Sequence, residues 1–439
     1  MPKKKGAFVS PFVPVEEQPY PIPENWCWTY LTGFAECLDS FRKPINATER
    51  AGRGGNVPYY GATGQVGWID DFLTDEQLVL VGEDGAPFLD RMKDKAYMIE
   101  GKAWVNNHAH ILRSYFGFIG NFYLLNYLNC FDYSSYVNGT TRLKLTQASM
   151  NTIPIPVSPL PEQQRIVARI KSLFAKLDEA KEKAQAVVDG FELCKSAILH
   201  KAFTGELTER WRKEHGVGLE SWAKVELIDV LTEKPRNGYS PKPVNYITPY
   251  KSMTLSATTS GVFKDEHFKY IDEMIPEDSY LWLKPGDILI QRANSLDKVG
   301  TSAIYTGREH EFIYPDLMMK LQVIKTVSPQ FVAYSLKKDD TLAYFRANAT
   351  GTAGNMPKIN QKTVSNTPIN LPTFGEQIEI VCILENLLDK AQQAKEAAEI
   401  VLAQIDTMKK AILARAFRGE LGTNDPAEEW AGEMVKTVL

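Results

Sequence analysis

The chain has 439 residues, of which 44% are hydrophobic and 24% charged, the balance of an ordinary globular protein with roughly two to four domains. It contains no unbroken apolar run of about eighteen residues, and no apolar stretch follows its basic start, so we expect neither a membrane span nor a signal peptide, and a cytoplasmic location. Five scattered cysteines without a Cys-x-x-Cys pair argue against a disulfide framework or a thiolate zinc site, and the net charge of −4 lacks the basic excess typical of nucleic-acid-binding domains.

The first part of the chain predicts a tail and then a mixed domain. Residues 1–19 form the tail, and residues 20–160 are rich in Gly, Pro, Asn, Tyr and Trp. Short apolar runs between such turn-forming residues are typical of strands, and Gln77–Val81 is one example. A helix is expected near Phe118–Asn129. We therefore expect an α+β domain with mixed sheets.

A long helix is predicted over residues 161–205. Its apolar residues recur at alternating spacings of four and three from Ile166 onward, which is the period of a coiled coil. Pro161 and Glu162 mark its start, and Gly205 stands where a glycine commonly ends a helix. A linker is expected over residues 206–218.

The second half of the chain repeats this order with a second mixed domain. Residues 219–374 again combine short apolar runs with turn residues, and Gly286–Ile290 and Leu317–Ile324 are the clearest strand candidates. A helix is expected near Pro329–Lys337. This domain too is expected to be α+β.

A second long helix is predicted over residues 375–419, followed by a tail over residues 420–439. Thr373 and Glu376 have the spacing of a capping box, and Gly419 stands at the expected end of the helix.

The two halves are copies of one another. Residues 153–207 and 367–421 align without a gap at a constant offset of 214 residues, and about 22 of roughly 55 positions are identical. The similarity extends weakly upstream, because Lys144–Gln147 and Lys358–Gln361 fall at the same offset.

The apolar seams of the two predicted helices both become small in their middle, at Ala184 and Ala398. Small residues let two helix axes approach closely, so we expect the helices to pack against each other in antiparallel orientation. The alternative is that each helix packs only on its own domain.

Several phrases resemble the specificity subunits of type I restriction–modification enzymes, and the resemblance covers nearly the whole chain. It rests on the order domain, helix, domain, helix and on the phrases Ile153–Pro156, Pro161–Ile166, Pro368–Pro372 with Glu376-Gln377, Val57–Gly64 and Gly82–Gly85. The chain departs from the pattern at Gly375, where the first copy has Pro161.

The resemblance implies the α+β fold class in a particular form. Two target-recognition domains of mixed α/β structure are separated by two long antiparallel, coiled-coil-like helices, as a pseudo-twofold duplication. Each domain is expected to read one half of a bipartite target in double-stranded DNA. Methyltransferase subunits, of which two are expected, and restriction/translocase subunits are the other partners, with no membrane. S-adenosylmethionine, ATP and Mg²⁺ are expected in the partner subunits, and no cofactor in this chain.

The sequence offers no catalytic motif of its own. An adenine methyltransferase needs an Asn/Asp-Pro-Pro-aromatic loop, and Asn56–Tyr60 is only a loose echo of one. No Gly-x-x-x-x-Gly-Lys-Ser/Thr loop is present to hold phosphates. His108 and His110 are expected on one face of a strand, but no further ligands follow in a recognisable spacing. We therefore expect no catalytic residue and no metal site.

Base edges are read by positioned hydrogen-bond donors and acceptors on loops, mainly Arg, Lys, Asn and Gln. Each such residue has an alternative role as an ordinary solvated loop residue. The candidates in the first domain are Arg53, Tyr59, Gln65, Lys102, Asn106, Asn107, His108, Thr140, Thr141, Arg142 and Lys144. Those in the second domain are Arg292, Asn294, Lys298, Thr350, Asn355, Lys358, Asn360 and Gln361.

Two other functions remain open at this point. One is a cytosolic coiled-coil adaptor that binds proteins and has no DNA target. The other is a divergent base-modifying transferase. Sequence-selective binding to DNA distinguishes the first from the expected function, and methyl transfer by the chain alone distinguishes the second.

Overall fold

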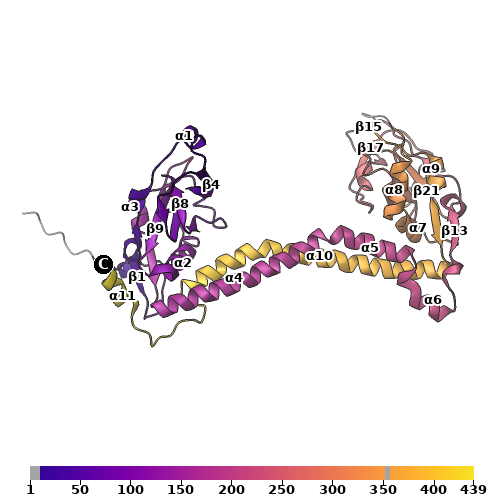
Figure 1. Cartoon of the computed structure of the whole chain (residues 1–439). Helices are drawn as coiled ribbons and strands as arrows, with labels where there is room; N and C mark the ends of the chain where they lie inside the picture. Colours follow the sequence, from indigo (N-terminus) through magenta and orange to yellow (C-terminus); the bar gives the residue numbers. More distant parts are fainter. Residues whose placement is uncertain (1–9, 352–355) are drawn as a thin grey trace, which may run out of the picture. The chain divides into compact units, whose positions relative to one another are not determined.

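The computed structural model describes residues 10–351 and 356–439. The chain divides into two compact units, which we call unit 1 (residues 10–185 with 399–439) and unit 2 (Ala186–Ala398). The division falls inside the long helices, so each unit combines one mixed domain with parts of both helical regions (Figure 1). The domain boundaries expected from the sequence stay a prediction.

Unit 1 is built on two four-stranded sheets and a strand pair. One sheet is antiparallel, in the order β2-β9-β6-β7, and the other has the order β4-β3-β8-β5 with β3 and β8 parallel. The strand pair joins β1 to β12 in antiparallel register. The strands are β1 (Cys27–Tyr30), β2 (Ala35–Cys37), β3 (Val57–Gly61), β4 (Gly64–Ile69), β5 (Thr74–Asp75), β6 (Leu78–Gly82), β7 (Ala96–Ile99), β8 (Lys102–Val105), β9 (Ala109–Ser114) and β12 (Pro154–Val157), with a short hairpin of β10 (Val137–Asn138) and β11 (Lys144–Leu145).

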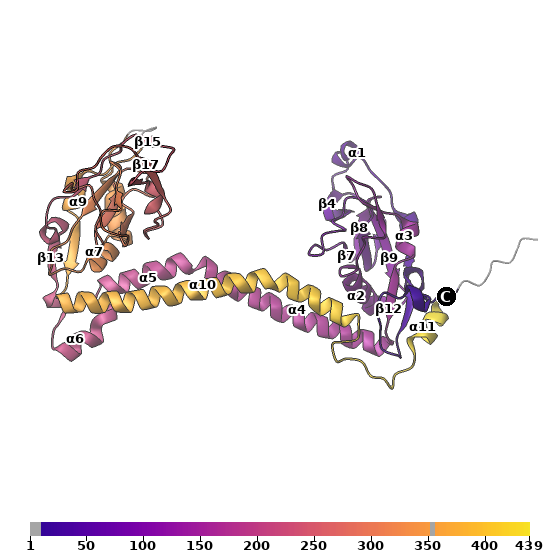
Figure 2. The ribbon, with the colours of Figure 1, turned by 180° about the vertical axis from the view of Figure 1, so that it is seen from behind.

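One helix of unit 1 packs on the antiparallel sheet, and three short helices lie elsewhere in the unit. The helix α2 (Gly117–Leu128) packs across β6, β7 and β9 (Figures 1 and 2). Short helices are α1 (Ala47–Ala51), α3 (Gln147–Asn151) and α11 (Ala431–Val438), and the last of these contacts β1.

Unit 2 has the same layout with different loops. Its strand pair is β13·β22, its antiparallel sheet has the order β14-β21-β18-β19, and its mixed sheet has the order β15-β17-β16-β20 with β16 and β20 parallel. The strands are β13 (Ala223–Glu226), β14 (Arg236–Asn237), β15 (Pro243–Val244), β16 (Tyr250–Met253), β17 (Phe268–Ile271), β18 (Ile288–Gln291), β19 (Ser302–Ile304), β20 (Phe312–Ile313), β21 (Met318–Leu321) and β22 (Pro368–Leu371). The helices are α6 (Glu209–His215), α7 (Pro329–Ser335), α8 (Asp339–Ala347) and α9 (Gln361–Ser365).

The expected fold class is confirmed. Both domains mix helices and sheets, the strand candidates in both domains form strands, and α2 and α7 lie where helices were expected. The strand that leads into each long helix, β12 in unit 1 and β22 in unit 2, repeats at the offset of the sequence duplication.

The long helices differ in continuity from the sequence prediction. In place of one helix over 161–205, the structure has α4 (Leu160–Asp189) and α5 (Phe191–Phe203), separated at Gly190. The backbone at Gly190 keeps helical angles, φ −81° and ψ −5°, so the interruption is local. Glycine weakens a helix because it has the greatest backbone freedom to lose. The second helix, α10 (Phe374–Ala416), is continuous.

The helices run antiparallel within each unit. In unit 1, Lys409 Nζ lies 2.6 Å from Asp178 Oδ1. Nearer the start of the first helix, Arg165 Nε donates to the carbonyl of Thr423, which follows the second helix. In unit 2, Lys395 lies over the Phe191 ring at 4.8 Å, while Thr208 contacts Glu376. In both pairs the residue numbers rise in opposite directions.

The strict heptad seam is only partly correct. The apolar repeat read from the sequence runs from Ile166 through Ile170, Ala184, Val187 and Cys194, and in the second copy through Ala398, Val401 and Met408. Ile166, Ile170 and Ala184 are buried as expected, but Val187 and Cys194 are exposed, as are Val401 and Met408 in the second helix. A helix of 3.6 residues per turn drifts away from a repeat of 3.5, so a straight helix turns later members of such a seam away from the buried side. Apolar residues at the end of α10 instead join the core of unit 1.

Each long helix begins at a buried glutamate. In unit 2, Glu376 accepts hydrogen bonds from Thr208, Arg212 and Trp222 at 2.7, 2.7 and 2.9 Å. The hydroxyl of Thr373 accepts from the Glu376 N–H at 3.4 Å, so that half of the expected capping box forms while the carboxylate serves these other donors.

In unit 1 the corresponding glutamate, Glu162, has a more exposed partner, Arg165. Glu162 accepts from Thr423 and Arg165, and burial raises its pKa against the effect of those hydrogen bonds. Gly205 and Gly419 take positive φ, 82° and 73°, just after their helices, as the sequence predicts.

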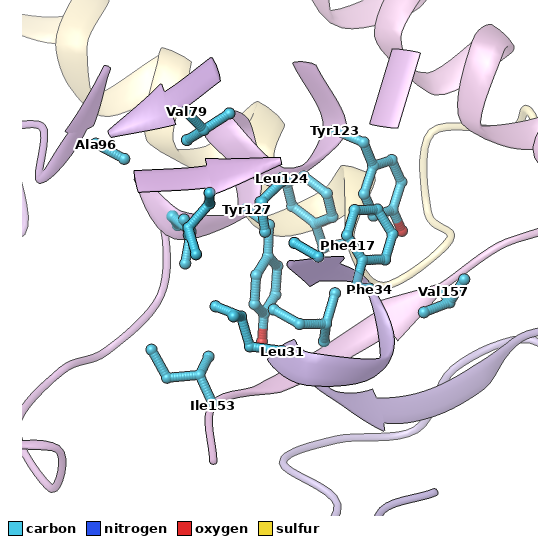
Figure 3. Packing of buried hydrophobic residues seen from close by; sticks show 14 of the residues in the cluster. Leu31, Phe34, Val79, Ala96, Tyr123, Leu124, Tyr127, Ile153, Val157 and Phe417 are labelled. Carbon is cyan, nitrogen blue, oxygen red and sulfur yellow. The ribbon is translucent and has the colours of Figure 1, made fainter. Parts of the chain in front are cut away.

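The core of unit 1 joins the helix α2 to the end of the second long helix. The Phe417 ring packs edge-on against Tyr123 and Tyr127 of α2, with centroids 5.0 and 5.1 Å apart, and Phe34 stacks on Tyr123 (Figure 3). Such aromatic pairs contribute about 0.5–1.5 kcal/mol each beyond their area of burial. The mixed domain and the helical region of unit 1 therefore share one core.

In the described part of the chain, residues 10–351 and 356–439, no helix is both long and apolar enough to cross a membrane.

Candidate nucleic-acid interface

In unit 1, loops from four parts of the domain meet beside the end of β6. They are the turn between β3 and β4, the turn between β8 and β9, the segment before β11 and the region around α1. Together they line a hollow of about 470 Å³. Its lining residues are Ile45, Asn46, Ala47, Arg50, Tyr59, Gly61, Ala62, Thr63, Val66, Asn106, Asn107, His108 and Arg142.

Two adjacent acids after β6 hold the basic side chains of this face. Glu83 pairs with Lys144 at 2.9 Å and with Arg42. Asp84 lies 2.6 Å from His108 Nδ1 and 3.0 Å from Arg142 Nη2. The four basic groups come from three separate segments, and the two acids bring them together.

A buried network supports these acids from below. The His110 side chain is 1% exposed, with Nδ1 2.6 Å from Asp39 and Nε2 2.8 Å from the carbonyl of Leu145. Burial alone would raise the pKa of Asp39, but the hydrogen bonds from His110 and Ile111 and the nearby charge of Arg42 contribute to lowering it, and the net pKa is lowered. The pKa of Glu83 is likewise lowered, because the hydrogen bonds from Arg42 and Lys144 outweigh its burial.

The turn between β8 and β9 is fixed by its own amides. Asn106 is buried, its N–H donates to the carbonyl of Tyr60, and its Oδ1 accepts from the His108 N–H at 2.8 Å. Arg42 donates to the carbonyl of Ala109 at 3.1 Å. The turn therefore presents Asn107 and His108 at a defined place on the hollow.

The other candidates of the first domain are more dispersed. The Tyr59 side chain is buried and its hydroxyl donates to Ile45, so it lines the floor of the hollow. Arg53 pairs with Asp70 and lies over the Trp104 ring. Lys102 begins β8, at the opposite end of that strand from Asn106, and Gln65 donates to its neighbour Gly67. Thr140 and Thr141 are exposed in the loop before β11.

In unit 2 the candidates gather around the end of β18. Ala293 and Thr350 both form bridges to Lys358, which brings these segments together beside Arg292. Asn294 donates to the buried Gln291 at 2.6 Å. The Nε atom of Arg292 is buried with no hydrogen-bond partner among the described residues, and its Nη1 reaches the Asp316 carbonyl at 3.5 Å.

Three further candidates of the second domain serve the local structure or lie at the surface. Asn360 caps α9 by accepting from the Thr363 N–H, and Gln361 donates to the carbonyl of Pro235. Lys298 is half exposed. Asn355 lies outside the described residues.

The two candidate faces share one backbone frame. In unit 1 the Leu145 N–H donates to the Glu83 carbonyl, and in unit 2 the Ile359 N–H donates to the Arg292 carbonyl. The next pair of bonds also corresponds, from Gly85 to Leu143 and from Asn294 to Pro357. Glu83 and Arg292 therefore occupy equivalent positions, with side chains of opposite charge.

Several residues that meet at this candidate face were not identified from the sequence. Arg42 and Arg50 lie in segments without a recognisable phrase, and Arg50 stacks over the Tyr59 ring at 4.8 Å. Glu83 and Asp84 stand in a phrase that carries the family resemblance, but they were not among the candidate residues. The phrase itself was the signal that could have found them.

One group of side chains in the described residues could hold a cation. Cys37, Asp39 and His110 offer ligand atoms within 4.8 Å of one another. Both ring nitrogens of His110 already have hydrogen-bond partners, and Asp39 also accepts from the Ile111 N–H. Hydrogen bonding accounts for this cluster.

Comparison with known proteins gives the family. The family model for the type I restriction modification DNA specificity domain matches twice, at residues 23–188 and 220–401. The EcoKI specificity subunit of Escherichia coli K12 is 28% identical over 300 residues, which are 67% of this chain and 63% of that protein. A putative type I specificity subunit of Haemophilus influenzae is 26% identical over 380 residues, 86% of this chain and 91% of that protein.

Solved structures show the same fold. The HsdS subunit of Thermoanaerobacter tengcongensis superposes with a TM-score of 0.64 at 18% identity, covering 93% of this chain and all of that one. A chain from a structural study of complex assembly in a type I restriction–modification system gives 0.59 at 18% identity, with 92% of this chain covered.

The repeated domain with a shared loop frame and divergent side chains defines a two-domain recognition scaffold. The chain belongs to the type I restriction–modification DNA specificity family, whose domain accounts for most of its length in two copies.

Proposed function

We propose that the chain is the DNA-reading specificity subunit of a type I restriction–modification system, with each domain reading one half of a bipartite duplex target. The observation that carries this proposal is the shared frame at the ends of β6 and β18. It offers Lys144 and Arg142 in one unit and Arg292 and Lys358 in the other. One frame with two sets of side chains suits one task applied to two different sequences.

The chemistry of both faces fits contact with duplex DNA. Arginine and lysine pair with the acceptor edge of guanine, and asparagine pairs with adenine. Asn107, His108 and Arg142 border the hollow of unit 1, and Arg142 is 62% exposed despite its pairing with Asp84. The same groups can also contact phosphates, which supply affinity without sequence information.

Membership of the family supports a proposal for the partners. Two methyltransferase subunits and the restriction/translocase subunits dock on this chain and supply all the chemistry, including S-adenosylmethionine, ATP and Mg²⁺. The chain itself contributes specificity and holds no catalytic group. The exposed apolar residues of the long helices, among them Val187, Leu193, Ile400 and Met408, support a docking role for these helices.

Methylation profiling of a host with and without the gene tests the function. A bipartite methylated sequence that disappears with the gene is the expected result. The chain purified with its methyltransferase subunits then shifts a duplex of that sequence in a gel, with affinity that falls as salt rises. Binding to protein partners without any preference among duplexes would instead indicate the adaptor function, and methyl transfer by the chain alone would indicate a transferase.

A further inference from the structure

The position of Glu83 and Asp84 is unexpected on a surface that meets a polyanion. The side chains of these acids are 13% and 22% exposed, whereas the Lys144 and Arg142 side chains that they hold are 52% and 62% exposed. The acids thus lie beneath the basic groups, which remain open to solvent. Carboxylates at such a place weaken the general attraction for DNA, so their presence needs another explanation.

The backbone around these acids ties three segments together. The Glu83 N–H donates to the His108 carbonyl at 2.8 Å, and the Glu83 carbonyl accepts from Leu145 at 2.7 Å. Gly85 has a φ of 73°, and a side chain there would meet the Arg142 guanidinium at 3.2 Å. The turn therefore fixes the backbone of the His108 and Lys144 segments as well as their side chains.

The buried histidine below fixes the same strand. His110 Nε2 faces a carbonyl oxygen, which only accepts, so this nitrogen carries a hydrogen and donates to Leu145. Asp39 holds the other side of the ring and also lies 3.0 Å from Arg42. Arg42 is in turn bound to Glu83, so a continuous set of contacts runs from the core to the exposed basic side chains.

Preorganisation is the physical gain from such contacts. Immobilising a long side chain at an interface costs about 0.5–1.5 kcal/mol, and a side chain that is already held loses less freedom when DNA binds. A fixed donor also discriminates better between bases, because a mismatched base cannot recruit it by a change of rotamer.

Unit 2 shows that the frame does not itself require an acid. Arg292 stands at the position of Glu83 and Ala293 at the position of Asp84, with the same backbone bonds. The acid pair is therefore a property of one reader and not of the fold.

We propose that Glu83 and Asp84 are positioning residues for base recognition by unit 1, and that they orient Lys144, His108 and Arg142 for one half of the DNA target. This inference rests on the proposed function. It makes a prediction opposite to that of simple electrostatics: removing negative charge from this surface lowers sequence discrimination although it raises general attraction for DNA.

The test uses the chain assembled with its methyltransferase subunits and duplexes of the sequence mapped by methylation profiling. Base changes are placed in one half-site or in the other, and exchange of residues 20–160 identifies the half read by unit 1. The double variant Glu83→Gln, Asp84→Asn is compared with Glu100→Gln. Glu100 is exposed and follows β7 at the far end of its pairing with β6, where Ile99 faces Leu78.

For the double variant we expect discrimination at the half-site of unit 1 to fall about tenfold, within the range that one bidentate contact supplies. The double variant should keep its discrimination at the other half-site, and its affinity for unrelated duplexes should rise. The control Glu100→Gln should keep its discrimination at both half-sites. In the host, relaxed sequences should become methylated at one half-site, which loss of folding would not produce.

Unchanged discrimination with higher affinity for all duplexes would overturn the proposal, because the acids would then act only through charge. The variant Asp84→Glu keeps the charge and displaces the carboxylate, so it should reduce discrimination without raising general affinity, and full activity of this variant would equally refute positioning. A wild-type complex that prefers no duplex would contradict the proposed function itself, which is a separate outcome.

Discussion

The ends of β6 and β18 carry the same backbone connections and opposite charges. In unit 1 the Glu83 carbonyl accepts from Leu145, and in unit 2 the Arg292 carbonyl accepts from Ile359. In unit 1 the acid Glu83 is surrounded by basic side chains from other segments, whereas unit 2 has the arginine Arg292 at the equivalent position. Backbone bonds depend little on side-chain identity, so the frame can persist while the side chains that it presents diverge. A conserved frame with exchangeable side chains is how a duplicated domain acquires a second specificity.

The largest expected effect comes from exchanging a whole domain. Replacing residues 20–160 with another recognition domain should change one half of the methylated target completely and leave the other half as it was, because each unit presents its own set of loop side chains. Methylation profiling of the exchanged chain measures this directly. If both half-sites changed together, the two domains would not read independently.

The next largest effect concerns the two glutamates that begin the long helices. Glu376→Ala leaves the Arg212 side chain, which is 7% exposed, without its carboxylate, and breaking a buried pair costs about 3–5 kcal/mol. Glu162→Ala should cost less, because the side chain of its partner Arg165 is 39% exposed and also pairs with Glu428. Denaturant unfolding of both variants gives the comparison, and equal losses would show that burial of the partner does not decide the cost.

Arg292 tests the reader in unit 2. Arg292→Ala should lower discrimination at the half-site of unit 2 by about 1–3 kcal/mol if the guanidinium pairs with a base. Lys325→Ala is the control with the same change of charge, since Lys325 is exposed and lies beyond the other end of β21 from Arg292. Competition between matched and mismatched duplexes measures both. A uniform loss for all duplexes would make Arg292 a phosphate contact.

The small residues of the two seams should respond alike. Ala184 and Ala398 are related by the sequence repeat and are 6% and 7% exposed. Leucine at either position should cost about 1–3 kcal/mol through overpacking. Glu182→Leu, at an exposed position on α4, should stay within about 0.5 kcal/mol. Thermal melting of the three variants decides, and equal shifts at Ala184 and Glu182 would mean that close packing is not needed there.

The smallest effect is a difference in acid sensitivity. The pKa values of Glu83 and Asp39 are lowered in the folded chain, so their stabilisation is present above the ordinary carboxyl value of 4.5 for Glu83 and is lost as pH falls through the folded values. The melting temperature of Glu83→Gln should therefore fall less steeply below about pH 5 than that of the wild type, whereas Arg292→Ala, which removes no carboxylate, should follow the wild type. Parallel curves for all three would contradict this account.

Much of the fold could be predicted because repetition and periodicity are local properties of the sequence. The duplication at an offset of 214 residues, the apolar runs that become β6, β18 and β21, and the glycines that follow the helices are all visible without coordinates. The break at Gly190 was not predicted, because one glycine within a strong helical pattern is usually tolerated.

The candidate interface was only partly accessible from the sequence. Asn106, Asn107, His108 and Arg142 were found because loop amides and bases are the usual readers of DNA, and the structure brings them to one hollow. Tyr59 was selected by the same reasoning, but its side chain is buried beneath them. Side chains along a strand alternate between the two faces of the sheet. While the pairing register is unknown, the sequence does not show whether a given tyrosine faces solvent or the core.

The sequence by itself determined the order of domains and helices, the family and the absence of familiar catalytic motifs, since each depends on residues close together in the chain. Only the tertiary structure decided which charges meet. Glu83 lies 61 positions from Lys144 and 41 from Arg42, yet these three side chains share one cluster. Such contacts depend on sheet order and loop path, which no local pattern records. The phrase that contains Glu83 and Asp84 is visible in the sequence, but only the tertiary structure shows which basic side chains these acids hold.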